Sequence, residues 1–186
     1  MKVKIIFVLM VAWVSFSTHG QGTILFNNRV TGQVDAPFSM PDGRGVGMYD
    51  SPVHAQLYLV SGPGAGDVYT PLFPSTTFRT TSSAASFYLT QPAAPVVVPG
   101  VPAGSEATVL MRIWTEAPTY EEAFPNYRGQ SSLVTITLGG VPPGGGAPIP
   151  DAVLVGLHGG FAVPEPSTMS LALLGGAVLL CRRRGE

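Results

Sequence analysis

Strict alternation in one nine-residue stretch, Ala107 to Thr115 (ATVLMRIWT), restricts that stretch to a β-strand. Side chains of a strand point alternately to its two faces, so residues two apart share a face. One face receives Ala107, Val109, Met111 and Ile113, and the other receives Thr108, Leu110, Arg112 and Trp114. The first set is wholly apolar, so we expect it to face the core.

Shorter segments with strand character lie on both sides of this one, and none of the chain between the two ends has a sustained helical period. The other predicted strands are residues 22–28, 54–60, 76–80, 85–90, 131–138 and 152–158. Thr119 to Ala123 can form one helical turn, because Pro118 and Pro125 limit its length. The 23 glycines and 18 prolines supply turns between short strands. We therefore predict an all-β fold: an antiparallel β-sandwich, Ig-like or jelly-roll-like, of about seven or eight strands.

The N-terminal end has the three parts of a signal peptide. Lys2 and Lys4 precede an uncharged apolar run, residues 5–16, of about a dozen residues, whereas a membrane span needs roughly 20. Small residues follow at Thr18 and Gly20, which suits signal peptidase cleavage before Gln21. We expect residues 1–20 to be removed after export through the Sec machinery.

The C-terminal end carries a second composite signal in residues 163–186. Its first part is Val163, Pro164, Glu165, Pro166, Ser167 and Thr168. An apolar run, Met169 to Cys181, follows and is predicted to be a helix; a cluster of Arg182, Arg183 and Arg184 comes next. Arginines beside an apolar helix stay on the cytoplasmic side, so they should hold the tail in the inner membrane. Residues 21–162 remain as one predicted extracytoplasmic domain.

This order of elements resembles the PEP-CTERM sorting signal of Gram-negative bacteria, which is also labelled a C-terminal domain of ice-binding proteins. The resemblance implies processing by an exosortase, a membrane transpeptidase, and an association with exopolysaccharide or biofilm matrix. It also implies an inner-membrane intermediate that ends at the cell surface or in the extracellular matrix. More loosely, residues 22–28, 55–58 and 101–109 resemble segments of small PEP-CTERM proteins from Verrucomicrobia-like bacteria.

Composition narrows the function of the central domain. Both lysines lie in the leader and three arginines lie in the tail, which leaves five arginines and a mildly acidic domain. Nucleic-acid binding requires a basic patch, so no nucleic-acid partner is expected. The single cysteine, Cys181, lies in the tail, and the domain therefore has no disulfide and no thiol chemistry.

The motifs of catalysis and metal binding are weak. A zinc site needs three or four convergent ligands, and His54 and His158 are far apart in sequence. Asp42 and Gly43 fit a turn better than a calcium loop. Glu121 and Glu122 are adjacent, so they cannot flank one glycosidic bond from opposite sides. We expect no enzyme activity, no metal and no cofactor.

Aromatic side chains offer the one candidate for ligand contact. Trp114 lies on the face opposite Val109 and Met111, so we expect an exposed ring that could stack on a sugar. The pair Thr135 and Thr137 is too small an array for ice binding. The sequence predicts an exported, non-catalytic surface or matrix protein; the alternative is a carbohydrate-binding module of the cell envelope, with polysaccharide as partner.

Overall fold

The computed structural model describes residues 20–40, 42–62 and 67–158. Ten strands are described there, and every pairing between them is antiparallel. They are β1 (Gln21–Ile24), β2 (Arg29–Val30), β3 (Val34–Asp35), β4 (His54–Ser61), β5 (Val68–Pro71), β6 (Thr76–Thr77), β7 (Val96–Pro102), β8 (Glu106–Trp114), β9 (Arg128–Gln130) and β10 (Val134–Thr137). Two short 3₁₀ helices, η1 (Val46–Met48) and η2 (Pro125–Tyr127), interrupt them. The all-β, antiparallel prediction is confirmed.

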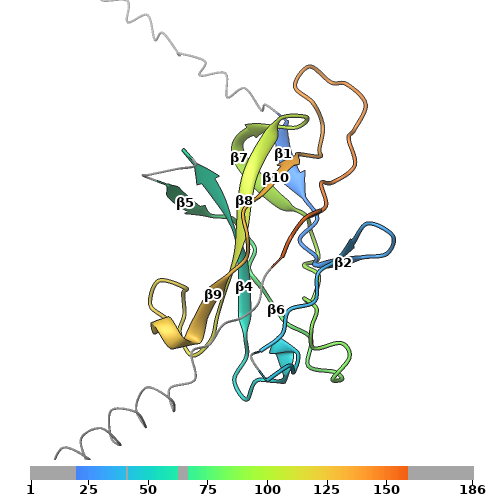
Figure 1. The fold of residues 1–186 in the computed structure, drawn as a ribbon. Helices are drawn as coiled ribbons and strands as arrows, with labels where there is room; N and C mark the ends of the chain where they lie inside the picture. The colour runs from blue at the N-terminus through green and yellow to red at the C-terminus, as the bar shows by residue number, and fades with distance from the viewer. Residues whose placement is uncertain (1–19, 41, 63–66, 159–186) are drawn as a thin grey trace, which may run out of the picture.

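The largest sheet is built around β4 and β8, which run side by side through the middle of the molecule (Figure 1). Its order is β10-β8-β4-β5, with β6 also paired to β4 and β9 also paired to β8. The register places Leu57 opposite Met111 and Tyr58 opposite Leu110. Smaller sheets join β1 to β7 and β2 to β3.

The main core lies between one face of the large sheet and the β1–β7 pair. Ala107, Val109, Met111 and Ile113, the face predicted to point inward, are all at most 5% exposed. The β1–β7 pair adds Ile24, Val96 and Val98 to the same cluster. Loop side chains such as Phe26 and Phe38 complete it. The alternation in β8 therefore predicted its buried face correctly.

Two predicted strands are turns in the structure. Residues 85–90 form successive turns in which the amide of Ser86 donates to the carbonyl of Ser82, and that of Tyr88 to Ala85. The apolar side chain of Leu89 reaches the core from an isolated bridge to Phe78. Residues 152–158 likewise contribute only a bridge, between Ala152 and Ile24. Leu89 in the first segment and Ala152, Leu154 and Leu157 in the second are buried without a ladder of backbone hydrogen bonds.

Strand β7 was absent from the prediction although its residues are valine-rich. Proline lacks the amide hydrogen needed for a ladder, and both Pro99 and Pro102 fall within it. The strand tolerates them because β1 is its one partner strand among the described residues. The predicted strand at 76–80 is shorter than expected, since β6 ends at Thr77.

The end of the described chain is fastened to the junction between β9 and β10. The carbonyl oxygen of His158 accepts hydrogen bonds from the amide and the hydroxyl of Ser132, at 2.8 and 3.1 Å. The amide of His158 donates back to the Ser132 hydroxyl at 3.2 Å. These three hydrogen bonds hold His158 against the edge of the large sheet.

Candidate functional site

The outer face of the large sheet carries a second, smaller core. Tyr58, Val60 and Leu110 are 2%, 5% and 2% exposed there, and the partly buried rings of Tyr69 and Tyr120 pack against them. Tyr120 belongs to the segment after β8, which folds back over this face. One helical turn in that segment, closed by the Ala123 amide donating to the Thr119 carbonyl, agrees with the predicted turn.

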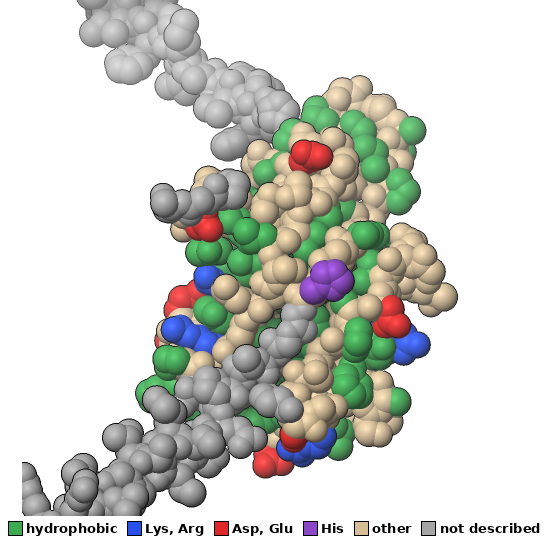
Figure 2. Space-filling view, viewed as in Figure 1, with side chains coloured by type: hydrophobic (Ala, Val, Ile, Leu, Met, Phe, Trp, Pro, Cys, Tyr) green, Lys and Arg blue, Asp and Glu red, His purple; other side chains and the backbone are tan. Residues whose placement is uncertain are grey.

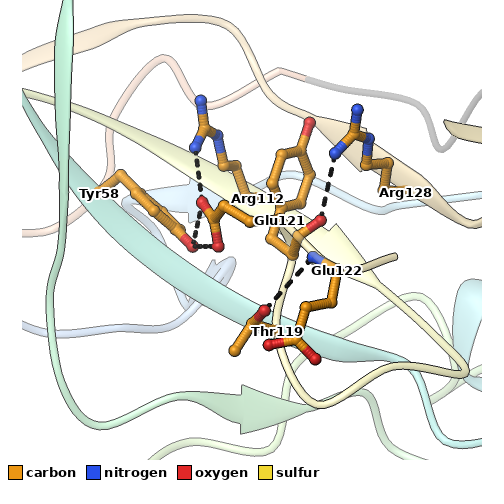
Figure 3. A network of polar contacts seen from close by, with 7 residues as sticks. Tyr58, Arg112, Thr119, Glu121, Glu122 and Arg128 are labelled. Carbon is orange, nitrogen blue, oxygen red and sulfur yellow. Dashed lines mark hydrogen bonds and ion pairs between the residues drawn. The ribbon is translucent and has the colours of Figure 1, made fainter. Parts of the chain in front are cut away.

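The guanidinium of Arg112 lies at the centre of this cluster, stacked among three tyrosines. Its central carbon is 4.5, 4.2 and 4.6 Å from the ring centres of Tyr58, Tyr69 and Tyr120. Its Nη1 donates to Glu121 Oε1 at 3.2 Å, and the Tyr58 hydroxyl donates to the same carboxylate (Figure 3). Cations are attracted to aromatic faces, most strongly where water is excluded. Arg112 thus joins β4, β5, β8 and the returning segment.

Polar groups in the cluster are almost fully used in holding it together. Arg128 donates to the Tyr120 carbonyl at 3.4 Å and lies 5.1 Å from the Tyr120 ring centre. The Arg112 Nε is buried without a hydrogen-bond partner in the described part of the chain. Burial and then the Glu121 charge raise the pKa of Tyr58 to about 12. The described polar groups of the cluster thus bond mainly to one another.

The raised pKa of Tyr58 predicts a loss of stability at high pH. An unfolded tyrosine ionises near pH 10, whereas folded Tyr58 keeps its proton to about pH 12, so the free energy of unfolding falls across that window. We expect Tyr58 to contribute about 1 kcal/mol of this fall once solvent screening near Glu121 is included. Urea unfolding at stepped pH checks it, with Tyr58→Phe as the control. Equal slopes for wild type and Tyr58→Phe would rule out this origin.

Trp114, the predicted ligand-stacking residue, is buried, so the expectation of an exposed ring is wrong. Its side chain is 2% exposed, its Nε1 donates to the Ala117 carbonyl at 3.0 Å, and His54 stacks on its ring at 5.5 Å. Periodicity placed Trp114 correctly on the outer face. The segment that begins at Ala117 then covers that face, which alternation within β8 cannot reveal.

An open cleft of about 570 Å³ lies elsewhere, between the η1–β4 connection and β6 with the residues that follow it. Its lining residues are Gly47, Tyr49, Asp50, Ser51, Pro52, Val53, Thr77, Phe78, Arg79, Thr80, Thr81 and Thr90. The two walls are tied by the Phe78 amide donating to the Val53 carbonyl at 3.2 Å. A side chain on Gly47 would meet the Arg79 carbonyl oxygen at 2.0 Å, so only glycine allows this close approach.

One end of the cleft adjoins an unusual backbone conformation. Glu116, two positions after the end of β8, has a φ of 59°, a left-handed value that non-glycine residues adopt at some cost. Its carboxylate accepts a hydrogen bond from the Ser51 hydroxyl at 3.4 Å. Burial, and then the charge of Glu116, raise the pKa of Tyr49 above its usual value. Tyr49 is therefore a protonated phenol at neutral pH.

The remaining motif residues do not converge on a site. In the described part of the chain, no three acidic, histidine or cysteine residues are grouped to hold a metal ion. Asp42 forms a turn, as expected, by accepting from the Arg44 amide at 2.9 Å. Glu121 is paired with Arg112, while the amide of Glu122 donates to the Thr119 hydroxyl at 3.4 Å.

The predicted processing residues lie mostly outside the described residues. Thr18, Val163, Pro164, Glu165, Pro166, Ser167, Thr168, Arg182, Arg183 and Arg184 all do so, as do the apolar segments at both ends. Gly20 and Gln21 are described: the Gly20 carbonyl accepts from the Ala103 amide at 3.0 Å, and Gln21 pairs with Pro102. No helix between residues 20 and 158, in the ranges described, is long and apolar enough to cross a membrane.

These observations define a protein with an antiparallel all-β body, and its predicted export and sorting signals lie in the segments on either side of that body. Residues 162–184 match the family model of the PEP-CTERM protein-sorting motif. The chain thus carries a PEP-CTERM protein-sorting motif in its tail, as the sequence predicted. The motif implies recognition by an exosortase, export and an extracellular or cell-surface destination. No curated protein and no solved structure matches the chain.

Proposed function

We propose that this chain is a non-catalytic protein of the cell surface or extracellular matrix of a Gram-negative bacterium, associated with exopolysaccharide or biofilm. The observation that carries the proposal is the sorting motif at residues 162–184, which implies the route. The body, a β-sandwich in this proposal, is the cargo delivered by that route. Sec export and signal peptidase cleavage before Gln21 precede sorting, and the body works without a cofactor.

The buried Arg112 cluster supports a structural cargo. It fixes the returning segment to the outer face of the large sheet by three ring contacts and one ion pair. On the face shown in Figure 2, charged side chains are few and scattered, without a basic patch. Such a surface suits a matrix component that meets uncharged partners. Carbohydrate binding is the second candidate, because six of the twelve residues that line the open cleft carry hydroxyl groups and the rest of the lining is largely apolar.

Expression of the full-length chain in one host with and without its exosortase tests the proposal. With the enzyme, we expect a smaller product that is digested by protease added to intact cells. Without it, we expect the unprocessed chain to remain with the inner membrane. Mass spectrometry of each fraction gives both ends of the product. The same mass and the same location in both hosts would overturn the proposal.

A further inference from the structure

The open cleft combines free hydroxyl groups with an apolar floor. The four threonines of its lining, Thr77, Thr80, Thr81 and Thr90, have side-chain hydroxyls that make no hydrogen bond within the described part of the chain. Hydroxyls both donate and accept, so they suit a ligand whose own groups do the same. Beneath them, Val53 and Phe78 are each 3% exposed. The cleft volume lies in the range of small-molecule sites, roughly 300–1,000 Å³.

The charges and the aromatic ring that line the cleft narrow the chemical class of its ligand further. The lining holds one cation, Arg79, and one carboxylate, Asp50, so the cleft has no net charge to attract a polyanion. The Nε of Arg79 donates to the Leu89 carbonyl at 2.9 Å, which orients the guanidinium from one side. Tyr49 adds a half-buried ring whose body packs on the main core. Aromatic side chains offer an apolar face together with a polar tip.

The walls of the cleft are fixed by backbone hydrogen bonds. The Gly47 amide donates to the Ser86 carbonyl at 2.8 Å, and the Thr90 amide donates to the Thr77 carbonyl at 2.8 Å. The Thr76 hydroxyl also donates to the Thr90 carbonyl. The threonine hydroxyls are therefore presented from a framework whose own polar groups are already paired. A ligand that enters such a framework orders few protein groups on binding.

From this arrangement we propose that the cleft binds a neutral oligosaccharide. This proposal rests on the carbohydrate-binding function proposed above and names the class of its ligand. Sugar hydroxyls exchange hydrogen bonds with Thr80, Thr81 and Thr90, and the apolar C–H face of a ring packs toward Val53 and Tyr49. Asp50 accepts from a pair of sugar hydroxyls. This places the carbohydrate site in the cleft, whereas the sequence had placed it at Trp114.

Calorimetric titration and amide chemical-shift mapping with maltohexaose, cellohexaose and mannohexaose test the proposal on the product purified after expression of the full-length chain. We expect millimolar or tighter binding of at least one of them, with shifts confined to amides around Ser51, Thr80 and Thr90. Thr80→Val and Asp50→Ala should each weaken binding by about three- to tenfold, the equivalent of one hydrogen bond. Thr137→Val, an exposed threonine on β10, is the matched control and should leave binding unchanged.

Other outcomes overturn the proposal. These are no binding of any of the three neutral sugars, binding only of a hexuronate oligomer, or shifts that map away from the cleft. Sorting is measured on the same variants, because the cleft lies outside the sorting motif and should not affect it. A protein that is sorted but binds no neutral sugar refutes only the proposed sugar site in the cleft. A protein that binds sugar but stays unprocessed in the membrane refutes the sorting route alone.

Discussion

Replacing Pro164, Glu165 and Pro166 with alanine is expected to abolish sorting and leave the unprocessed precursor in the inner membrane. Proline blocks helix formation and biases the residue before it away from helical backbone, so this element favours an extended approach to the apolar segment. An extended segment can enter the cleft of a processing enzyme, whereas three alanines favour helix. The expected loss is nearly complete, and fractionation with blotting in an exosortase-bearing host measures it.

The body supplies a matched control for this substitution. Pro148 and Pro150 form a second Pro-x-Pro element that is exposed in the structure and lies outside the matched motif. Alanine at these two positions should leave sorting at the wild-type level.

Deleting Arg182, Arg183 and Arg184 should instead release unsorted protein, because the retention signal is gone. If both tail variants are processed and placed like wild type, the tail acts only as an anchor.

Shortening Leu110 to alanine should destabilise the protein by about 2–3 kcal/mol, as expected for a cavity made in a core. Leu110 is 2% exposed although it lies on the face of β8 that points away from the main core. A sheet with one wet face would tolerate this change. Urea unfolding of the purified protein, followed by circular dichroism, measures the difference in the free energy of unfolding.

Thr137 provides the comparison for Leu110, since it is exposed on the same face of the same sheet. Thr137→Ala should change the free energy of unfolding by no more than about 0.5 kcal/mol, the usual range for an exposed site. A Leu110→Ala variant as mild as Thr137→Ala would mean that the returning segment does not seal the outer face in solution.

Alternation correctly predicted the strands that pair in a sheet and bury every second side chain. The segments that became β4, β8 and β10 were predicted to within a few residues, because each has a run of inward-facing apolar side chains. Alternation predicted strands wrongly around Leu89, which is buried from an isolated bridge, and around Leu154, which is buried from an irregular segment. Apolar residues in a turn give the same signal as those in a strand when the segment is short.

Neither of the two polar groupings could be predicted from local pattern. Arg112 and Tyr69 are 43 positions apart along the chain, and the contact depends on which strands pair. The cleft similarly brings Asp50, in the η1–β4 connection, close to Thr90, which lies much later in the chain. The tail was predictable because its meaning lies in the order of consecutive residues, which an enzyme reads without reference to a fold.

The hydrogen bonds between His158 and Ser132 set the length of the tether between the folded body and the sorting element. Pro164 lies six positions after His158, and a fully extended chain spans at most about 22 Å over six positions. An enzyme that acts at Pro164 therefore works within about 22 Å of the anchored residue His158, unless those hydrogen bonds open first.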